Sequence, residues 1–193
     1  TVRELRERTG IGMMACKKAL QETDGDLDRA VDYLRGQGMA AVEKRSSRDA
    51  LEGLVTSYIH PGNRLGVLVE VNCETDFVAR TDDFQQFAKD VAMHIAASQP
   101  LAVDRQSIPA ELVEKEKAIY LEQSKNEGKP EHIAEKIVEG RLEKYFQENC
   151  LLEQPFVKNP DQTISELITE LTAKIGEKIS VRRFERFILG DDA

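Results

Sequence analysis

Apolar residues recur at helical spacing through the first 35 positions and predict three short helices. The segment 9-TGIG-12 separates the first helix from the second, 13-MMACKKAL-20, and Asp26 can cap the third. Four apolar residues of the third helix fall on one face: Leu27, Ala30, Val31 and Leu34. Three helices of about two turns each bury little surface, so residues 1–35 are expected to form a small satellite domain or a docking module.

Residues 36–53, GQGMAAVEKRSSRDALEG, are rich in alanine, glycine and charged residues and have no wide apolar face. This composition predicts a linker that can be partly helical. We therefore expect two folded units on either side of it, the small helical domain at residues 1–35 and a larger domain at residues 54–193.

The larger domain is predicted to begin with a β-hairpin. Residues 55–60, VTSYIH, alternate between the two faces of a strand, and 61-PGNR-64 has the composition of a tight turn. Residues 65–72, LGVLVEVN, return as a strongly apolar strand. The hairpin ends just before Asp76 and Phe77, where an acidic and an aromatic side chain stand next to each other.

The middle of the chain has a helical pattern. An apolar stripe runs through residues 82–98, and Asp82 and Gln85 have the spacing of a capping box in its acidic form. Two consecutive charged segments, at 110–125 and 131–148, are separated by a short break and predict an antiparallel pair of helices.

The C-terminal part combines a loop, a helix and a strand. Residues 151–162 contain two prolines and are expected to form a loop. Thr163 and Glu166 can form a capping box for a helix that stops at Gly176. Residues 179–189 are β-branched and aromatic, and their imperfect alternation indicates a bulge or a second, weaker face.

Together these patterns predict an α+β fold. An N-terminal three-helix domain is followed by a core of helices packed on a small antiparallel sheet of at least three strands. The order of the elements lacks the regular alternation of strand and helix that a doubly wound nucleotide-binding fold requires.

Composition narrows the classes of partner. The chain has 35 acidic and 27 basic residues, a net charge of -8, which disfavours direct binding to nucleic acid. No apolar run approaches the roughly 20 residues of a membrane span. The cysteines and histidines have no metal-ligand spacing, so no metal and no cofactor are expected, and the odd number of cysteines favours free thiols in a reducing compartment. No leader is visible, and the missing initiator Met indicates processing or trimming.

The sequence contains no catalytic constellation. It has no phosphate-binding glycine loop and no nucleophile motif. Cys16 lies beside Lys17 and Lys18, but a small buried thiol is the better interpretation. The chain is therefore interpreted as a binding protein and not an enzyme, with a thiol enzyme using Cys16 or Cys73 as a competing hypothesis.

The pair Asp76 and Phe77 allows two interpretations. In the first, Asp76 accepts hydrogen bonds from backbone N–H groups of a turn while Phe77 packs into the core. In the second, Phe77 is an exposed probe that enters a pocket of a partner, beside a carboxylate that reorganises a charged site. Periodicity alone leaves both interpretations open.

Two separated signatures, 5-LRERTGIGMMACKKAL-20 and 70-EVNCETDFVAR-80, resemble the translation elongation factor Ts family. Further matches lie at 129-KPEHIAEKIVEGRLEKYF-146, 154-QPFVKNP-160 and 173-AKIGEKISVRRF-184. The resemblance covers essentially the whole chain. It implies a guanine nucleotide exchange factor for elongation factor Tu with an N-terminal domain like a ubiquitin-associated module. It also implies a location in the bacterial cytoplasm, or in an organelle interior if a leader has been removed.

The resemblance also implies contact residues. The motif Thr75, Asp76, Phe77 and Val78 is expected near the phosphate and magnesium site of the GTPase, where Phe77 wedges between helices and Asp76 perturbs the polar network around the ion. Six further positions follow: Met13, Met14, Lys17, His94, Ile175 and Gly176. Each of the six has a structural alternative, because a Met can belong to the core, Lys17 can be a solvated charge, His94 can be a capped core histidine, and Ile175 with Gly176 can form an ordinary helix end.

Longer members of this family carry a duplicated core, whereas this chain has room for one copy. The resemblance to the short form implies a homodimer in a two-to-two complex, with the exposed face of the small sheet as the dimer surface. A further competing hypothesis is an adaptor built on the ubiquitin-associated-like module, which binds other proteins without exchange activity.

Overall fold

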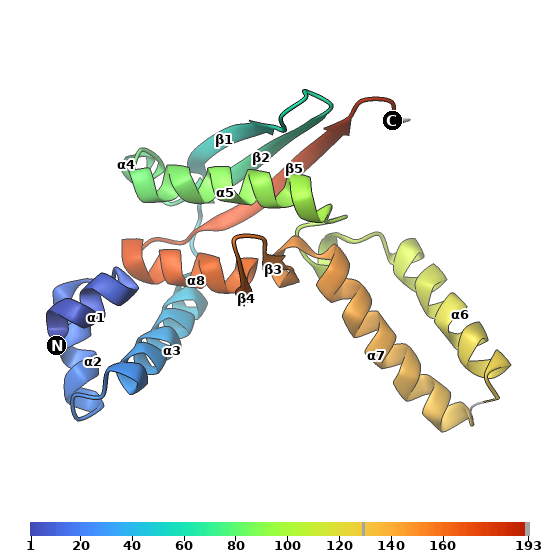
Figure 1. Cartoon of the computed structure of the whole chain (residues 1–193), viewed down its shortest axis with the longest axis horizontal. Coiled ribbons are helices and arrows are strands. Elements are labelled where there is room, and N and C mark those ends of the chain that lie inside the picture. The colour runs from blue at the N-terminus through green and yellow to red at the C-terminus, as the bar shows by residue number, and fades with distance from the viewer. Residues whose placement is uncertain (129, 192–193) are drawn as a thin grey trace.

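The N-terminal helices form because each has a specific start and stop signal. In a computed structural model that describes residues 1–128 and 130–191 (Figure 1), Thr1 and Glu4 form a capping box at the start of α1, and Gly10 ends this helix with a left-handed φ of 68°. The side chain of Asp26 accepts from two backbone N–H groups at the start of α3. The three helices are α1 (Val2–Thr9), α2 (Met13–Glu22) and α3 (Leu27–Arg45). A small core of Leu5, Cys16, Ala19, Ala30 and Leu34 joins them.

Helix α3 is longer than the sequence pattern predicted. It continues to Arg45, so the helix occupies residues 36–45 of the expected linker, and the irregular connection is limited to residues 46–51. The second half of α3 has no wide apolar face because it packs through a small residue: a Cβ placed on Gly38 would lie 3.3 Å from Ala173 in α8. The three-helix unit is therefore attached directly to the rest of the protein.

A three-stranded antiparallel sheet lies at the centre of the larger unit. Its strands are β1 (Glu52–Ile59), β2 (Leu65–Cys73) and β5 (Ser180–Ile188), in the order β1-β2-β5. The hairpin of β1 and β2 was predicted and is confirmed. The register between β2 and β5 shifts between Glu70 and Val71, which confirms the irregularity expected in the last strand.

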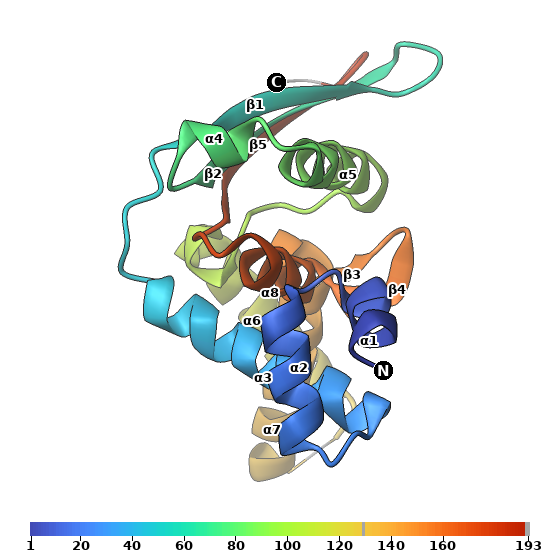
Figure 2. The same cartoon turned by 90° about the vertical axis from the view of Figure 1, so that its left-hand side faces the viewer.

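Helices cover one face of this sheet in layers. Val67, Val69 and Val71 are buried on the inner face of β2 and pack against α5 (Asp82–Ser98), and α8 (Ile164–Ile175) lies beneath α5 (Figure 2). The capping box of Thr163 and Glu166 and the glycine stop at Gly176 are present in α8 as predicted. Together with the sheet, these layers confirm the α+β fold.

The predicted cap of α5 was wrong by one residue. Thr81 is the N-cap and its hydroxyl accepts from the backbone N–H of Phe84, whereas Asp82 occupies the first turn. A hydroxyl oxygen serves this role as well as a carboxylate does, and an acid in the first turn is stabilised by the helix dipole.

A helical arm extends from the body of the protein (Figure 1). It consists of α6 (Ala110–Asn126) and α7 (Glu131–Asn149), the expected antiparallel pair. Near its base, in the short η1 (Arg105–Ser107), Arg105 pairs with Glu143 and Glu153 and lies 4.7 Å from the centre of the Phe146 ring.

The segment expected as a loop at residues 151–162 is more ordered than predicted. It contains η2 (Leu151–Glu153) and a small antiparallel pair, β3 (Pro155–Phe156) and β4 (Asn159–Thr163). Pro155 is the first residue of β3, Pro160 is the second residue of β4, and the buried ring of Phe156 anchors this pair in the core, so the prolines do not exclude strand structure here. None of the helices in residues 1–128 and 130–191 combines the length and apolarity needed to cross a membrane.

Gly53 provides a test of the sheet geometry. Its φ is 140°, and a Cβ at this position would lie 2.1 Å from the carbonyl oxygen of Val71. We expect Gly53→Ala to lower the free energy of unfolding by at least about 2 kcal/mol, measured by urea denaturation. Gly36→Ala is the matched control, because Gly36 is helical and a Cβ there would have no tertiary neighbour within 4 Å among the residues that the structure describes, and it should raise stability by up to about 1 kcal/mol. Equal effects at the two positions would contradict the close approach of β1 and β2 at Gly53.

Candidate protein-interaction site

Phe77 stands in a single helical turn directly after the hairpin. Strand β2 ends at Cys73, and the four-residue helix α4 (Asp76–Ala79) begins with Thr75 as its N-cap. Phe77 is 77% exposed, whereas Val78 packs against the core and Ala79 is buried. The ring is therefore directed into solvent by a turn whose next two residues are anchored, and the interpretation that Phe77 packs inward was wrong.

Asp76 does not cap the turn. Its carboxylate accepts a hydrogen bond of 2.7 Å from Arg80, one helical turn later, while the backbone N–H of Val78 is bonded by the hydroxyl of Thr75. The expected role of Asp76 in bonding backbone N–H groups thus belongs to Thr75. An exposed pair of this kind contributes only about 0.3–0.5 kcal/mol, so a partner can separate Asp76 from Arg80 at little cost.

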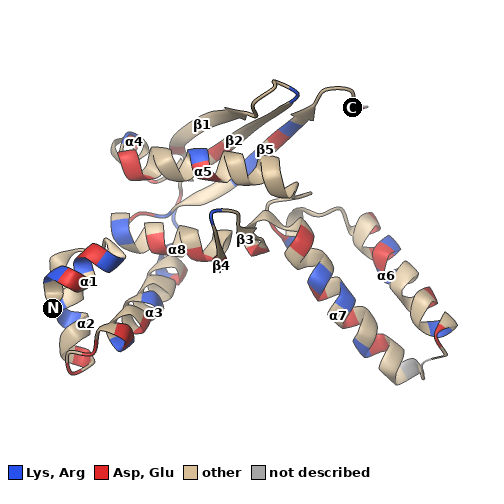
Figure 3. Cartoon of the chain, in the orientation of Figure 1, with Lys and Arg blue, Asp and Glu red and all other residues tan. Residues whose placement is uncertain are grey.

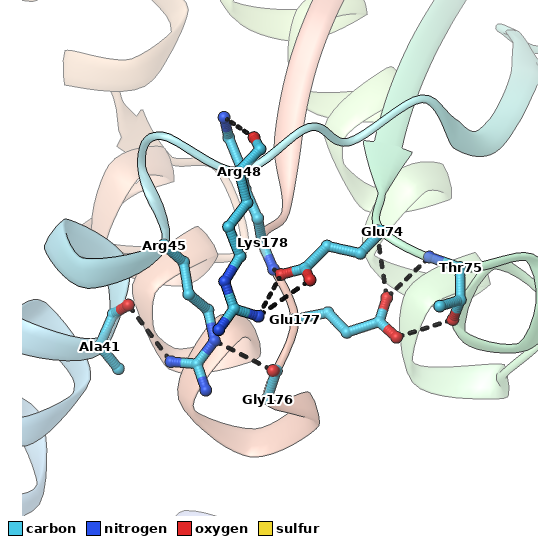
Figure 4. A network of polar contacts seen from close by, with 8 residues as sticks. All are labelled: Ala41, Arg45, Arg48, Glu74, Thr75, Gly176, Glu177 and Lys178. Carbon is cyan, nitrogen blue, oxygen red and sulfur yellow. Dashed lines mark hydrogen bonds and ion pairs between the residues drawn. The ribbon is translucent and has the colours of Figure 1, made fainter.

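The turn is supported by a network of polar contacts (Figure 4). One oxygen of Glu177 accepts from the backbone N–H groups of Glu74 (3.1 Å) and Thr75 (3.0 Å), and the other accepts from the Thr75 hydroxyl (2.7 Å). In return, the carboxylate of Glu74 accepts from the backbone N–H of Lys178 (2.7 Å) and from Arg48 (3.0 Å). The hydrogen bond from Lys178, followed by that from Arg48, lowers the pKa of Glu74 despite opposing desolvation.

Ile175 and Gly176 lie at the same junction. Ile175 is partly buried against the core, and Gly176 ends α8 with φ 84° while its carbonyl oxygen accepts from Arg45 (3.0 Å). The structure therefore brings these two predicted residues close to the turn of Phe77 through Glu177. Sequence reasoning missed Glu177 and Glu74. The only local signal was their position, Glu177 directly after a glycine stop and Glu74 directly before the Thr75 cap.

A second set of predicted residues lies on α2. Met13 and Met14 are 56% and 77% exposed and Lys17 is also exposed, whereas Cys16 faces the small core. The alternative that one of these methionines belongs to the core was wrong. Both α2 and α4 lie on the side of the molecule that faces the viewer in Figure 2, so both sets can face one partner.

His94 is a core residue and not a surface contact, so its prediction as a contact is corrected. It is fully buried in α5, and its Nδ1 accepts from the backbone N–H of Val157 (3.3 Å). Its proton is therefore on Nε2, which donates to Gln154 (2.9 Å). The Gln154 amide group in turn donates to the carbonyl oxygens of Ser98 and Glu148. Burial lowers the pKa of His94, against a smaller opposing effect of the bond to Gln154.

The thiols offer no support for nucleophilic chemistry. All three cysteines are buried, and Cys16 donates to the carbonyl oxygen of Ile11. Burial raises the pKa of both Cys73 and Cys150 to about 11. Among the described residues, His, Cys, Asp and Glu form no group arranged to hold a metal ion. Figure 3 shows acidic and basic residues mixed along α1, α3, α6 and α7, whereas a nucleic-acid-binding helix typically carries a basic stripe.

The fold and this site define an α+β protein with a fixed, exposed aromatic turn at the end of a hairpin. The sequence profile of the family described as "Elongation factor TS" matches residues 40–171. The elongation factor Ts of Heliobacterium modesticaldum is 65% identical over 190 residues, covering 98% of this chain and 88% of the relative. Those of Carboxydothermus hydrogenoformans and Geobacter sulfurreducens are 60% and 59% identical with the same coverage. The chain belongs to the elongation factor Ts family.

The burial of His94 predicts a pH-dependent contribution to stability. A glutamine amide that replaces Nε2 in its bond to Gln154 leaves no atom at the position of Nδ1, so His94→Gln leaves the Val157 N–H without its partner, and we expect it to lower the free energy of unfolding at pH 7.5 by about 1–3 kcal/mol. The folded pKa of His94 is lowered, so its contribution is complete above its ordinary pKa of 6.5 and decreases as the pH falls below that value. The difference between wild type and variant, measured by urea unfolding, should therefore be smaller at pH 5 than at pH 7.5.

His60→Gln serves as the control for this experiment, because His60 is exposed beside the hairpin turn. It should change stability at pH 7.5 by no more than about 0.5 kcal/mol. A difference between wild type and His94→Gln that is the same at both pH values would contradict the assignment of His94 as a buried neutral group.

Proposed function

We propose that this protein is a guanine nucleotide exchange factor that promotes release of GDP from elongation factor Tu during translation elongation. The observation that carries the proposal is the 77% exposed ring of Phe77, held at the end of the hairpin beside the carboxylate of Asp76. Membership of the elongation factor Ts family supports the same function. The relatives named above are bacterial, and we place the activity in the bacterial cytoplasm.

In the proposed mechanism, Phe77 inserts between helices of the GTPase near its phosphate and magnesium site. Burying such a ring in a partner contributes about 1.5–3 kcal/mol, which can offset the cost of moving those helices. Mg²⁺ requires near-ideal octahedral oxygen geometry, so a small displacement of the groups that support the ion weakens the binding of the nucleotide. Asp76 leaves its exposed ion pair with Arg80 and instead contacts the polar groups around the ion, which disturbs the arrangement that holds Mg²⁺.

Exchange requires that the factor bind the nucleotide-free partner more tightly than the GDP-bound partner. Linkage makes this antagonism reciprocal, so GDP must weaken binding of the factor by the same ratio.

Contacts from Met13, Met14 and Lys17 on α2 are proposed to dock the factor on the nucleotide-binding domain. Methionine suits such a surface because its side chain is flexible and polarisable. The protein itself makes and breaks no covalent bond in this mechanism.

Release of a fluorescent GDP analogue from elongation factor Tu tests the proposal. Wild-type protein should accelerate release, and Phe77→Ala should lower the rate at saturating factor roughly tenfold to hundredfold, because burial of the ring is lost at the step of exchange. Asp76→Ala should lower it further in the double variant. Leu101→Ala, which truncates another exposed apolar residue far from the turn, is the control and should keep the wild-type rate.

Two results would count against these claims in different ways. No acceleration by wild-type protein that nevertheless binds elongation factor Tu would refute exchange and favour an adaptor. Full acceleration by the Asp76→Ala, Phe77→Ala double variant would refute the wedge mechanism and leave the function in place.

We further propose that the protein forms a homodimer through the outer face of its sheet. The inner face is covered by α5, whereas the outer face leaves five large apolar residues exposed: Val55, Ile59, Leu68, Phe187 and Leu189. The last four line a shallow groove at one end of the sheet. The pair of Glu70 and Arg183 lies beside this apolar area and supplies a polar edge. Two such sheets packed face to face form a symmetric interface with one apolar core.

Sedimentation equilibrium tests the dimer. The wild type should sediment as a dimer, and Leu68→Glu combined with Phe187→Glu should sediment as a monomer, because two charges would be buried without partners. Met39→Glu, at another exposed apolar position on α3, is the control and should remain dimeric. A wild-type protein that sediments as a monomer at all concentrations would contradict the proposal.

A further inference from the structure

Helix α4 is too short to be stable by itself. It consists of four residues, and isolated helices of this length do not form in water. The bond that caps it, from the Val78 N–H to the Thr75 hydroxyl, is long at 3.4 Å. The ring of Phe77 is mostly exposed, so its direction depends on the backbone of this turn being held by something outside the turn.

The outside support comes from Glu177. Its carboxylate accepts hydrogen bonds from two backbone N–H groups at the end of the hairpin, those of Glu74 and Thr75. These two residues lie beyond the last pair of β2 with β5, so their N–H groups have no partner in that strand. It also accepts a hydrogen bond from the Thr75 hydroxyl, with 2.7 Å between the two oxygens. With its proton directed to Glu177, the Thr75 hydroxyl can only offer its lone pairs to the Val78 N–H. Glu177 therefore sets the orientation of the group that caps α4.

Glu177 is itself held in place. It follows Gly176, whose left-handed φ of 84° turns the chain from α8 towards β5. The next residue, Lys178, donates its backbone N–H to Glu74, so residues 74 and 177 each bond the backbone of the other segment. The Lys178 ammonium group donates to the carbonyl oxygens of Ser46 (2.6 Å) and Arg48 (2.7 Å) in the connection from α3. The support of the turn is thus continuous with α8, β5 and the three-helix unit (Figure 4).

We infer that Glu177 is a positioning residue for nucleotide exchange, whose carboxylate fixes the Thr75–Val78 turn and so directs Phe77 at the GTPase. This inference rests on the function proposed above. Glu177 acts through Phe77 and needs no contact with the partner. A rigid turn transmits the displacement to the partner, whereas a mobile turn allows the ring to bind without moving the partner's helices.

The test compares Glu177→Ala with Glu177→Gln in the release of fluorescent GDP. Glu177→Ala should lower the rate at saturating factor about tenfold, because the turn loses three hydrogen bonds. Glu177→Gln should remain within roughly threefold of wild type, because the amide oxygen can accept the two N–H groups, and the two lone pairs of the Thr75 hydroxyl allow it to accept from the amide nitrogen as well as from the Val78 N–H. Glu170→Ala is the matched control: Glu170 is exposed on α8 and makes no ion pair within the described residues.

A double-variant cycle shows whether Glu177→Ala acts by releasing the turn of Phe77 or by unfolding part of the protein. Partial unfolding of Glu177→Ala would raise the concentration of factor needed for half-saturation and leave the saturating rate unchanged. Positioning through Phe77 predicts a lower saturating rate, and it predicts that Glu177→Ala has little further effect in a Phe77→Ala background. Independent, multiplicative effects of the two substitutions would overturn the inference.

Amide hydrogen exchange of the isolated protein distinguishes failure of the inference from failure of the proposed function. The N–H groups of residues 74, 75 and 78 should exchange at least about tenfold faster in Glu177→Ala than in wild type. If amide hydrogen exchange at these residues is the same in Glu177→Ala as in wild type, the inference is overturned even if wild type accelerates GDP release. If the amide hydrogens exchange faster in Glu177→Ala but wild-type protein has no effect on GDP release, the proposed function is refuted. A role of Glu177 in nucleotide exchange is then refuted with it.

Discussion

The carboxylates of Glu74 and Glu177 each accept backbone N–H groups from the other's chain segment, and the direction of Phe77 depends on this mutual bonding. A large apolar side chain exposed to water has no contacts of its own to hold it. It keeps one direction only when the backbone beneath it is held from several sides. Here Ala79 and Val78 hold the turn from the core, and Glu177 holds it from the junction of α8 and β5.

The three-helix unit shares this framework because it is attached to α8 at several points. Gly38 allows α3 to approach α8 closely, and Arg35 of α3 pairs with Glu166 at the start of α8. Lys174 packs against Gly10 and reaches Asp83 of α5 with its ammonium group. The exposed methionines of α2 and the ring of Phe77 are therefore held in a defined relation to each other. Two small contact areas held in this way can bind one partner with less loss of conformational entropy than two independent modules.

Elements with local signals could be predicted from the sequence, whereas features decided by distant residues could not. The cap of α8 by Thr163 and Glu166 and its end at Gly176 depend on neighbours in the chain, and both were predicted correctly. The direction of Phe77 depends on Glu177, about a hundred positions away, and no periodicity connects the two. His94 lies on the edge of an apolar stripe, and its burial and its bonds to Gln154 and Val157, which are distant in the sequence, show that it belongs to the core. The second half of α3 was expected only as part of a linker that can be partly helical, because its packing uses Gly38 instead of large apolar residues.

The arm of α6 and α7 leaves the body of the protein and returns to almost the same point. Ala102 and Cys150 form a bridge at its base, and the N–H of Leu151 donates to the carbonyl oxygen of Ala102. The chain on both sides of the arm would therefore join with little rearrangement if the arm were absent. In evolutionary terms the arm has the geometry of an insertion, whose length and surface can change while the sheet, α5 and α8 keep the turn of Phe77 unaltered.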